Sequence, residues 1–204
     1  MDIREKHIGF LRNVELQFRL ASAVRLATTL ERQPLDLPAE WSHGNHTVKY
    51  EEIALHPLQA DFAAYHLQRA ATYLMAVQIL KAIKETVPDA RTHSNSSIRA
   101  AYQISRMIRN SFTHNPLQPV WALDPDCLNQ TFSIPGTIQF DTKLLQGKEF
   151  DWRDYGGPLA LLRLNQYVRC EILGDEPQAH SERVTRKPDV EVFQQGDLIL
   201  TKLD

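Results

Sequence analysis

SIRAAYQISRMIRNSFTHNP, residues 97–116, is the stretch from which the fold of this chain can be predicted. Its apolar residues recur every three or four positions, which is the spacing of one face of an α-helix. The Ser-Asn-Ser at 94–96 consists of residue types that cap helix starts, and Pro116 cannot continue a helix. We therefore predict a helix from Ser97 to about His114.

This helix has an apolar face and a polar face. At about 100° per residue, the apolar face carries Ala101, Ile104, Ile108 and Phe112. The opposite stripe carries Arg99, Gln103, Arg106 and Asn110, with Arg109 at one edge and His114 at the other. We expect the apolar face to be buried in the core and the polar stripe to remain accessible to solvent.

Three further helices are predicted by the same periodicity, over residues 3–32, 57–87 and 157–173. Asp2, with Glu5 three residues later, is typical of a capping box at the first of them. After Pro116, short segments rich in β-branched and aromatic residues indicate a small antiparallel β element. The predicted fold class is mainly α, a four-helix up-and-down bundle with an antiparallel β insertion between the third and fourth helices.

We expect one helical domain over residues 1–174, with the β insertion at 117–153, and a polar C-terminal tail over 175–204. Within the tail, VEVF and LILTKL favour short strands. Residues 34–56 contain two prolines and few apolar residues in register, so we expect a long connection with a short strand near 47–50.

Composition excludes several classes of function. A net charge of −2 over 204 residues argues against a general polyanion binder, so contact with nucleic acid requires a local basic patch. Cys127 and Cys170 form no disulfide framework by spacing, and a cytoplasmic chain is the simplest interpretation. MDIREKHIGF carries charges where a signal peptide needs apolar residues, and no stretch is long enough for a membrane span.

Metal and cofactor motifs are weak in this sequence. His43 and His46 in WSHGNH invite a metal site, but no Cys or further His lies at a matching spacing, and a solvated loop explains them better. No glycine-rich phosphate loop or nucleophile elbow is present, so we expect neither metal nor cofactor. Asp124 and Asp126 are explained by turn formation.

Arg109 and Asn110, followed by His114, are the strongest functional motif. The pattern Arg-Asn-x-x-x-His near the end of a long helix, in a mostly helical chain, resembles the signature of the HEPN superfamily (higher eukaryotes and prokaryotes nucleotide-binding). The resemblance implies a bundle of about four helices and a homodimer in which the motifs of two protomers meet in one cleft. Active members are metal-independent endoribonucleases of toxin–antitoxin, antiphage and RNA-processing systems.

The chemistry of RNA cleavage suits these residues. Histidine titrates near neutral pH and can move a proton, and the planar, charged guanidinium of arginine matches phosphate geometry. We expect Arg109 and His114 to be catalytic, with Asn110 orienting the imidazole or donating to a phosphate oxygen. Arg109 lies about 140° around the helix from His114, so the hypothesis requires the reach of the long Arg side chain, distortion at the helix end or a second protomer to bring them together.

Arg99, Gln103 and Arg106 are the expected RNA-binding residues, because they continue the polar stripe below the motif. RNA, a second copy of the chain and a cognate antitoxin are the expected partners. The competing hypothesis is a non-catalytic helical homodimer or partner-binding module in which the Arg/His motif is structural.

Overall fold

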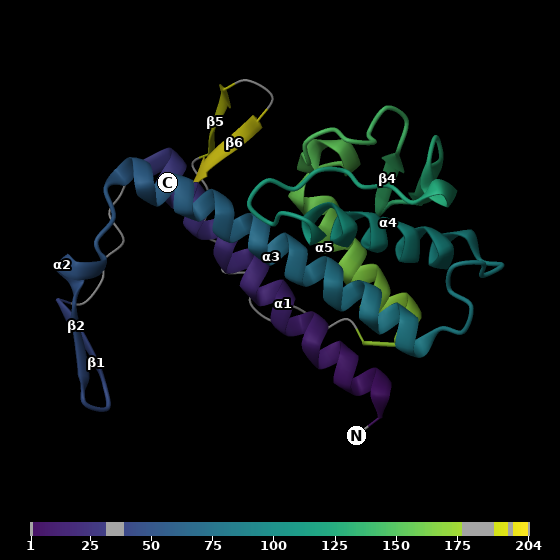
Figure 1. The fold of residues 1–204 in the computed structure, drawn as a ribbon, viewed down its shortest axis with the longest axis horizontal. Helices are drawn as coiled ribbons and strands as arrows, with labels where there is room; N and C mark the ends of the chain where they lie inside the picture. Colours follow the sequence, from purple (N-terminus) through teal and green to yellow (C-terminus); the bar gives the residue numbers. More distant parts are fainter. Residues whose placement is uncertain (1, 32–38, 177–189, 196–197, 204) are drawn as a thin grey trace.

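The computed structural model describes residues 2–31, 39–176, 190–195 and 198–203 (Figure 1). Four long helical segments make up most of the described chain, and two of them continue into a π-helical turn. The helices and turns are α1, Ile3–Leu26; η1, Ala27–Glu31; α3, Pro57–Thr86; α4, Ser96–Thr113; α5, Pro158–Tyr167; and η4, Val168–Ile172. The mainly helical fold and the four predicted helices are confirmed.

The helix α3 is the central element. α1 lies beside it and runs in the opposite direction, and α4 lies on the other side of α3 from α1 (Figure 1). α5 contacts both α1 and α3. Within the part of the chain that the structure describes, none of the helices is both long and apolar enough to cross a membrane.

The helix starts depend on local hydrogen bonds. Asn95 Oδ1 accepts from the backbone N–H groups of Ser97 and Ile98, at 2.9 and 3.4 Å, and so begins α4 as the sequence predicts. At α3 the cap is His56, whose Nδ1 accepts from the Leu58 N–H at 3.3 Å. Asp2 does stand at the N-cap position of α1, but its side chain makes no cap hydrogen bond, so the capping box expected there is not formed.

The core lies between α1, α3 and α4. Each helix contributes its periodic apolar face, including Leu11 and Phe18 of α1 and Met75 and Ile79 of α3. The predicted core residues of α4 are also confirmed, since Ile104, Ile108 and Phe112 are all buried. Burial of these side chains removes apolar surface from water, which is the main force that holds the helices together.

The predicted β insertion is confirmed as an antiparallel hairpin between α4 and α5. Its strands are β3, Thr131–Ile134, and β4, Ile138–Asp141, and short helical turns flank it at η2, Pro125–Cys127, and η3, Trp152–Tyr155. Trp121 is the centre of its packing, with 1% of the residue exposed and ring contacts to Phe140, Phe150 and Tyr155. The indole Nε1 of Trp121 donates to Asp154 Oδ2 at 2.7 Å, so the buried polar edge is satisfied.

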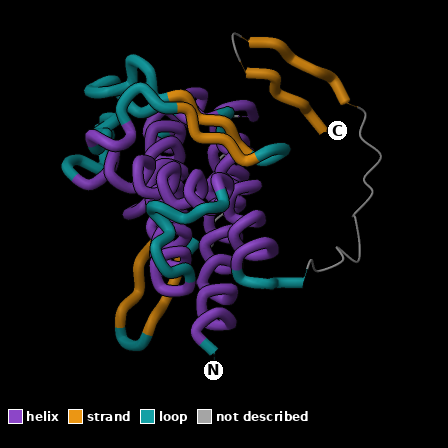
Figure 2. Tube along the Cα trace, turned by 90° about the vertical axis from the view of Figure 1, so that its right-hand side faces the viewer, coloured by secondary structure: helices purple, strands orange, loops and turns teal. Residues whose placement is uncertain are grey.

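Two further hairpins lie outside the helical core (Figure 2). One joins β1, Glu40–His43, to β2, His46–Lys49, and leads into the short helix α2, Tyr50–Ile53. The other joins β5, Val190–Gln195, to β6, Leu198–Leu203, and confirms the strands expected in VEVF and LILTKL. Residues 39–56 are therefore more ordered than the long connection that we expected, whereas residues 32–38 and 177–189 lie outside the described residues.

Asp175, the residue at which we expected the polar tail to begin, is packed against the helices. The residue is 8% exposed and accepts hydrogen bonds from two arginines, Arg12 at 2.5 Å and Arg169 at 3.1 Å. Arg169 also pairs with Glu15 of α1 at 2.9 Å. The end of η4 is thus fastened to α1 by a partly buried ion-pair network, which composition alone does not reveal.

Leu11→Ala and Leu16→Ala form a matched test of how α1 packs. Leu11 is 0% exposed and Leu16 is 67% exposed on the same helix. We expect Leu11→Ala to lower the free energy of unfolding by about 2–5 kcal/mol, because it leaves a cavity in the core, and Leu16→Ala to change it by less than about 0.5 kcal/mol. Urea unfolding followed by circular dichroism measures both, and equal losses would contradict the observed packing of α1.

Candidate functional site

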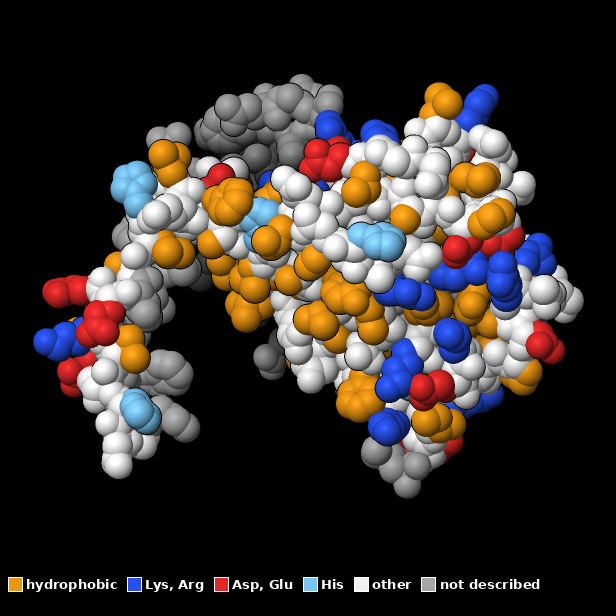
Figure 3. All heavy atoms as spheres, viewed as in Figure 1, with side chains coloured by type: hydrophobic (Ala, Val, Ile, Leu, Met, Phe, Trp, Pro, Cys, Tyr) orange, Lys and Arg blue, Asp and Glu red, His pale blue; other side chains and the backbone are white. Residues whose placement is uncertain are grey.

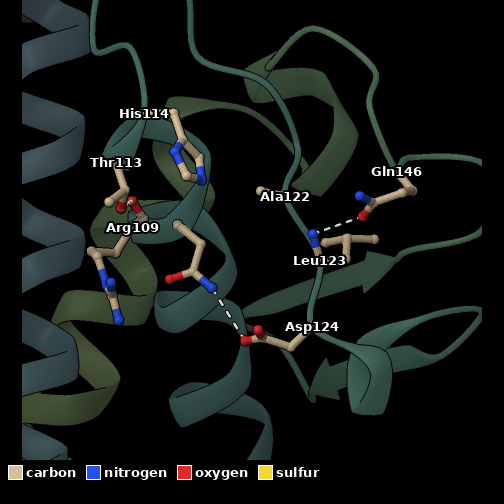
Figure 4. Close-up of a pocket in the computed structure, with 8 residues that line it drawn as sticks. Arg109, Thr113, His114, Ala122, Leu123, Asp124 and Gln146 are labelled. Atoms are coloured by element: carbon tan, nitrogen blue, oxygen red, sulfur yellow. Dashed lines mark hydrogen bonds between the residues drawn. The ribbon is translucent and has the colours of Figure 1, made fainter.

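The last turn of α4 and the first part of the β insertion enclose a pocket of about 260 Å³ (Figure 4). The pocket is lined by Arg109, Asn110, Thr113, His114, Ala122, Leu123, Asp124 and Gln146. The three residues of the predicted motif therefore share one pocket. In Figure 3, Lys and Arg side chains gather on the half of the molecule that holds α4, although the chain is slightly acidic overall.

The wall opposite α4 is held by backbone and side-chain hydrogen bonds. The N–H of Val120 donates to Ser111 O at 3.0 Å, and that of Trp121 donates to Lys148 O at 2.8 Å. Gln146 Oε1 accepts from the Leu123 N–H at 2.8 Å (Figure 4). These bonds fix residues 120–124 against the end of α4, so the pocket is formed by two segments that are each tied down.

Asn110 contacts the opposite wall of the pocket and not the histidine. Its Nδ2 donates to Asp124 Oδ2 at 3.2 Å, the bond that crosses to Asp124 in Figure 4. The expected role of Asn110 in orienting the His114 imidazole therefore gains no support from its hydrogen bond. The amide instead connects α4 to the β insertion.

Arg109 and His114 are available to a ligand. Arg109 is half-buried and His114 is exposed, and neither side chain has a hydrogen bond or an ion pair with any residue that the structure describes. The two side chains leave the helix in different directions, and the guanidinium of Arg109 points away from His114 (Figure 4). This divergence agrees with their angular separation on an ideal helix, so within one protomer they meet only through a bound molecule.

The expected RNA-binding residues are less accessible than the sequence suggests. Gln103 is 4% exposed and Arg106 is 7% exposed, so our expectation that both lie in solvent is wrong. The reason is that the β insertion folds over this stripe of α4 and supplies carboxylates to it. Arg99 remains half-buried, and its Nη1 donates to the backbone oxygen of His93 at 2.7 Å.

Arg106 is the centre of a buried ionic network. Its Nη2 donates to Asp126 Oδ1 at 2.6 Å and to Cys127 Sγ at 3.2 Å. Its Nε lies 3.2 Å from Asp124 Oδ2, which is ion-pair distance without the alignment of a hydrogen bond. Burial lowers the pKa of Arg106, but the hydrogen bonds to Cys127 and Asp126 outweigh it and raise the pKa overall.

Asp126 accepts three hydrogen bonds in this network. The donors are Arg106, Gln103 at 3.1 Å and Arg91 at 3.0 Å. Burial raises the pKa of Asp126, but these three bonds together lower it below the ordinary value. Sequence analysis explained Asp124 and Asp126 as turn residues and missed this role. The two carboxylates of DPDC, in the segment that follows a predicted basic helix face, are the one feature that indicates it.

No metal site emerges from the described part of the chain, where no group of three or more His, Cys, Asp or Glu side chains could hold an ion. His43 and His46 are paired in register at the turn of the β1–β2 hairpin. Comparisons of the chain with protein-family models, with curated proteins and with solved structures give no match. The site is therefore interpreted from its own geometry and charge.

Asp126→Asn tests the ionic network through the pH dependence of stability. A carboxylate with a lowered folded pKa stabilises the fold above its ordinary pKa of about 4, and this stabilisation is lost as the pH falls through the folded value. We expect Asp126→Asn to lower the free energy of unfolding by about 1 kcal/mol at neutral pH, because solvent screens this partly exposed carboxylate, with a smaller difference from wild type below about pH 4.

Exposed Glu5 provides the control, because its substitution by Gln removes a carboxylate outside any such network. Glu5→Gln should change stability by less than about 0.5 kcal/mol at either pH. Denaturant unfolding at neutral and acidic pH measures both variants. A loss for Asp126→Asn that does not depend on pH would show that its charge is not the stabilising element.

Proposed function

We propose that this protein is a HEPN-like, metal-independent endoribonuclease that uses Arg109 and His114 to cleave RNA. The proposal includes a four-helix up-and-down bundle as the underlying arrangement and a homodimer in which the motifs of two protomers form one cleft. It also places the protein in the cytoplasm, in a toxin–antitoxin or antiphage system, where a cognate antitoxin would restrain its activity.

One observation carries the proposal. Arg109 and His114 line the same open pocket, and neither side chain is paired within the part of the chain that the structure describes. By contrast, Arg106, one turn earlier on the same helix, forms ion pairs with both Asp124 and Asp126. An unpaired guanidinium and an exposed imidazole that line one pocket suit a phosphate ligand, whereas a structural role would be expected to engage the two side chains with protein groups.

The reaction needs no group beyond the chain and its substrate. The 2′-hydroxyl oxygen of the RNA attacks the adjacent phosphorus, and the bond from phosphorus to the 5′-oxygen breaks. One histidine accepts the proton of the 2′-hydroxyl, and a second donates a proton to the departing 5′-oxygen. Arginine stabilises the negative charge that gathers on the phosphoryl oxygens. The products are a 2′,3′-cyclic phosphate and a 5′-hydroxyl end.

The divergence of Arg109 and His114 supports a shared site. A single protomer offers one histidine, and its arginine points elsewhere. Two pockets that face each other would supply two histidines and two arginines to one phosphate. The Asp124 carboxylate at the pocket edge is compensated by Arg106 at 3.2 Å, so it does not cancel the positive charge of the site.

Cleavage of single-stranded RNA in excess EDTA tests the proposal directly. We expect His114→Ala and Arg109→Ala each to reduce the rate by about 10²–10⁴, because each removes a group that acts on the reacting atoms. Arg163→Ala, an exposed arginine of α5, is the matched control and should retain the wild-type rate. Cleavage that survives in His114→Ala would place the activity elsewhere, and RNA binding without cleavage by wild type would favour the non-catalytic module.

Mixing the two inactive variants tests whether the site is shared. A cleft formed between an Arg109→Ala protomer and a His114→Ala protomer retains one arginine and one histidine. We expect the mixture to regain part of the activity after subunit exchange, whereas neither variant alone does so. Gel filtration before and after mixing reports the oligomeric state. A monomeric wild type with full activity would contradict the shared site.

A further inference from the structure

A second group of basic and aromatic side chains lies outside the pocket, where the end of α1 meets the middle of α3. The Cζ atom of Arg25 lies 4.5 Å from the centroid of the Tyr65 ring and 5.8 Å from that of Trp152. The Cζ atom of Arg69 lies 4.7 Å from the same Tyr65 ring. Two arginines therefore contact one tyrosine.

The two arginines differ in their partners. Arg69 is 3% exposed, and it donates to two backbone oxygens, those of Leu117 and Phe150, and to Glu149 Oε1, all at 3.2–3.3 Å. Arg69 is thus a structural residue that ties α3 to the β insertion. Its charge is paired with a single carboxylate.

Arg25 has no such partner. It makes neither a hydrogen bond nor an ion pair with the residues that the structure describes, and its Nη1 is buried without a hydrogen-bond acceptor. Asp61, a nearby carboxylate, instead accepts from Thr29 Oγ1 at 2.5 Å. Burial is the largest effect on Arg25 and lowers its pKa, whereas Tyr65 and Asp61 act in the opposite direction and the positive charge of Arg69 lowers the pKa a little further. The guanidinium nevertheless stays charged near neutral pH, since the ordinary pKa of arginine is far higher.

A half-buried guanidinium that forms no ion pair with the described residues is incompletely compensated, and a bound anion can supply the missing partner. Contact with two aromatic rings holds the guanidinium in place while leaving its planar fork of donors unused. That fork matches the oxygens of a phosphate group and can bind them in a bidentate manner. The arrangement of Arg25, Tyr65 and Trp152 is therefore suited to an anion of this geometry.

We propose that Arg25 is the centre of a second phosphate-binding site, which takes a phosphodiester group of an RNA strand. The RNA part of this inference rests on the proposed function. Arg69 contacts the backbone of Leu117, and the chain from His114 to Leu117 spans at most about 11 Å. These contacts together span more than one phosphate-to-phosphate step, so an RNA strand with its scissile phosphate at Arg109 and His114 would present to Arg25 a phosphate further along the strand. This second contact would set the register of the strand in the site.

RNA binding as a function of salt tests the second site. The assay uses a fluorescently labelled single-stranded RNA and full-length protein carrying His114→Ala, so that cleavage does not interfere. Each phosphate contact on a single strand contributes about 0.7 to the slope of log affinity against log salt. We expect Arg25→Gln to weaken binding and to reduce that slope by about 0.7. Arg4→Gln, the same charge change at an exposed position of α1, should leave the slope unchanged.

Arg25→Lys separates the charge from the planar fork. The lysine keeps a positive charge but loses the bidentate geometry, so the slope should be largely retained while the affinity falls. Thermal unfolding of each variant tests whether it is folded. If Arg25→Gln does not fold, the RNA affinity and its salt dependence are measured with Arg25→Lys alone. Equal RNA binding by the Arg25 variants and Arg4→Gln would overturn the proposal.

Titration with inorganic phosphate, followed by tryptophan fluorescence, distinguishes the two sources of the ligand. If the site at Arg25 takes a phosphodiester group of RNA, free phosphate should bind to it weakly and should not saturate it. Saturation that Arg25→Gln abolishes, together with unchanged RNA binding, would overturn the RNA source and assign the site to a free anion. Because cleavage is not measured, a protein without ribonuclease activity can still show the change in slope, and the two proposals can fail separately.

Discussion

The burial of Arg106 against Asp124 and Asp126 is the interaction on which the arrangement of the site depends. A guanidinium that is removed from water requires nearly complete pairing, because an uncompensated buried charge costs several kcal/mol (about 3–5 when one partner is removed). The two carboxylates come from a segment that begins at Asp124, with ten residues between it and Thr113 at the end of α4. Satisfying Arg106 therefore draws the β insertion over α4, and the same contact places Asp124 and its neighbours as the second wall of the pocket.

Four arginines, Arg25, Arg69, Arg106 and Arg109, fall into two groups that differ in their pairing. Arg69 and Arg106 are buried and paired, and they fasten the β insertion to α3 and α4. Arg25 and Arg109 are half-buried and unpaired within the described chain, and they lie close to members of the first group. Pairing of the structural arginines leaves the positive charge of the other two uncancelled, which is the electrostatic condition that the two proposed phosphate contacts share.

Sequence periodicity predicts the helices of this fold well, because the spacing of apolar residues along each helix indicates which of its faces is buried. It also places Arg109, Asn110 and His114 near one helix end, and the pocket does contain all three. It fails for Gln103 and Arg106, because a polar stripe has the same pattern whether it faces water or a second layer that carries opposite charges. The hydrogen bond from Asn110 to Asp124 was beyond prediction for the same reason, since its acceptor belongs to a segment without helical periodicity.

One wall of the pocket is formed by the end of α4 and the other by the β insertion. This division has a consequence for how the specificity of the pocket could change. Arg109 and His114 lie at the end of α4, and the apolar face of this helix is buried in the core. Ala122, Leu123 and Gln146 belong to the β insertion, whose hairpin and aromatic residues around Trp121 pack into the same core as the helices. Substitutions or length changes in that insertion can reshape the entrance and floor of the pocket without moving the helix. In the proposed enzyme, the shape of the pocket and its reacting groups would thus be carried by different segments of the chain, so that one could diversify while the other stays constant.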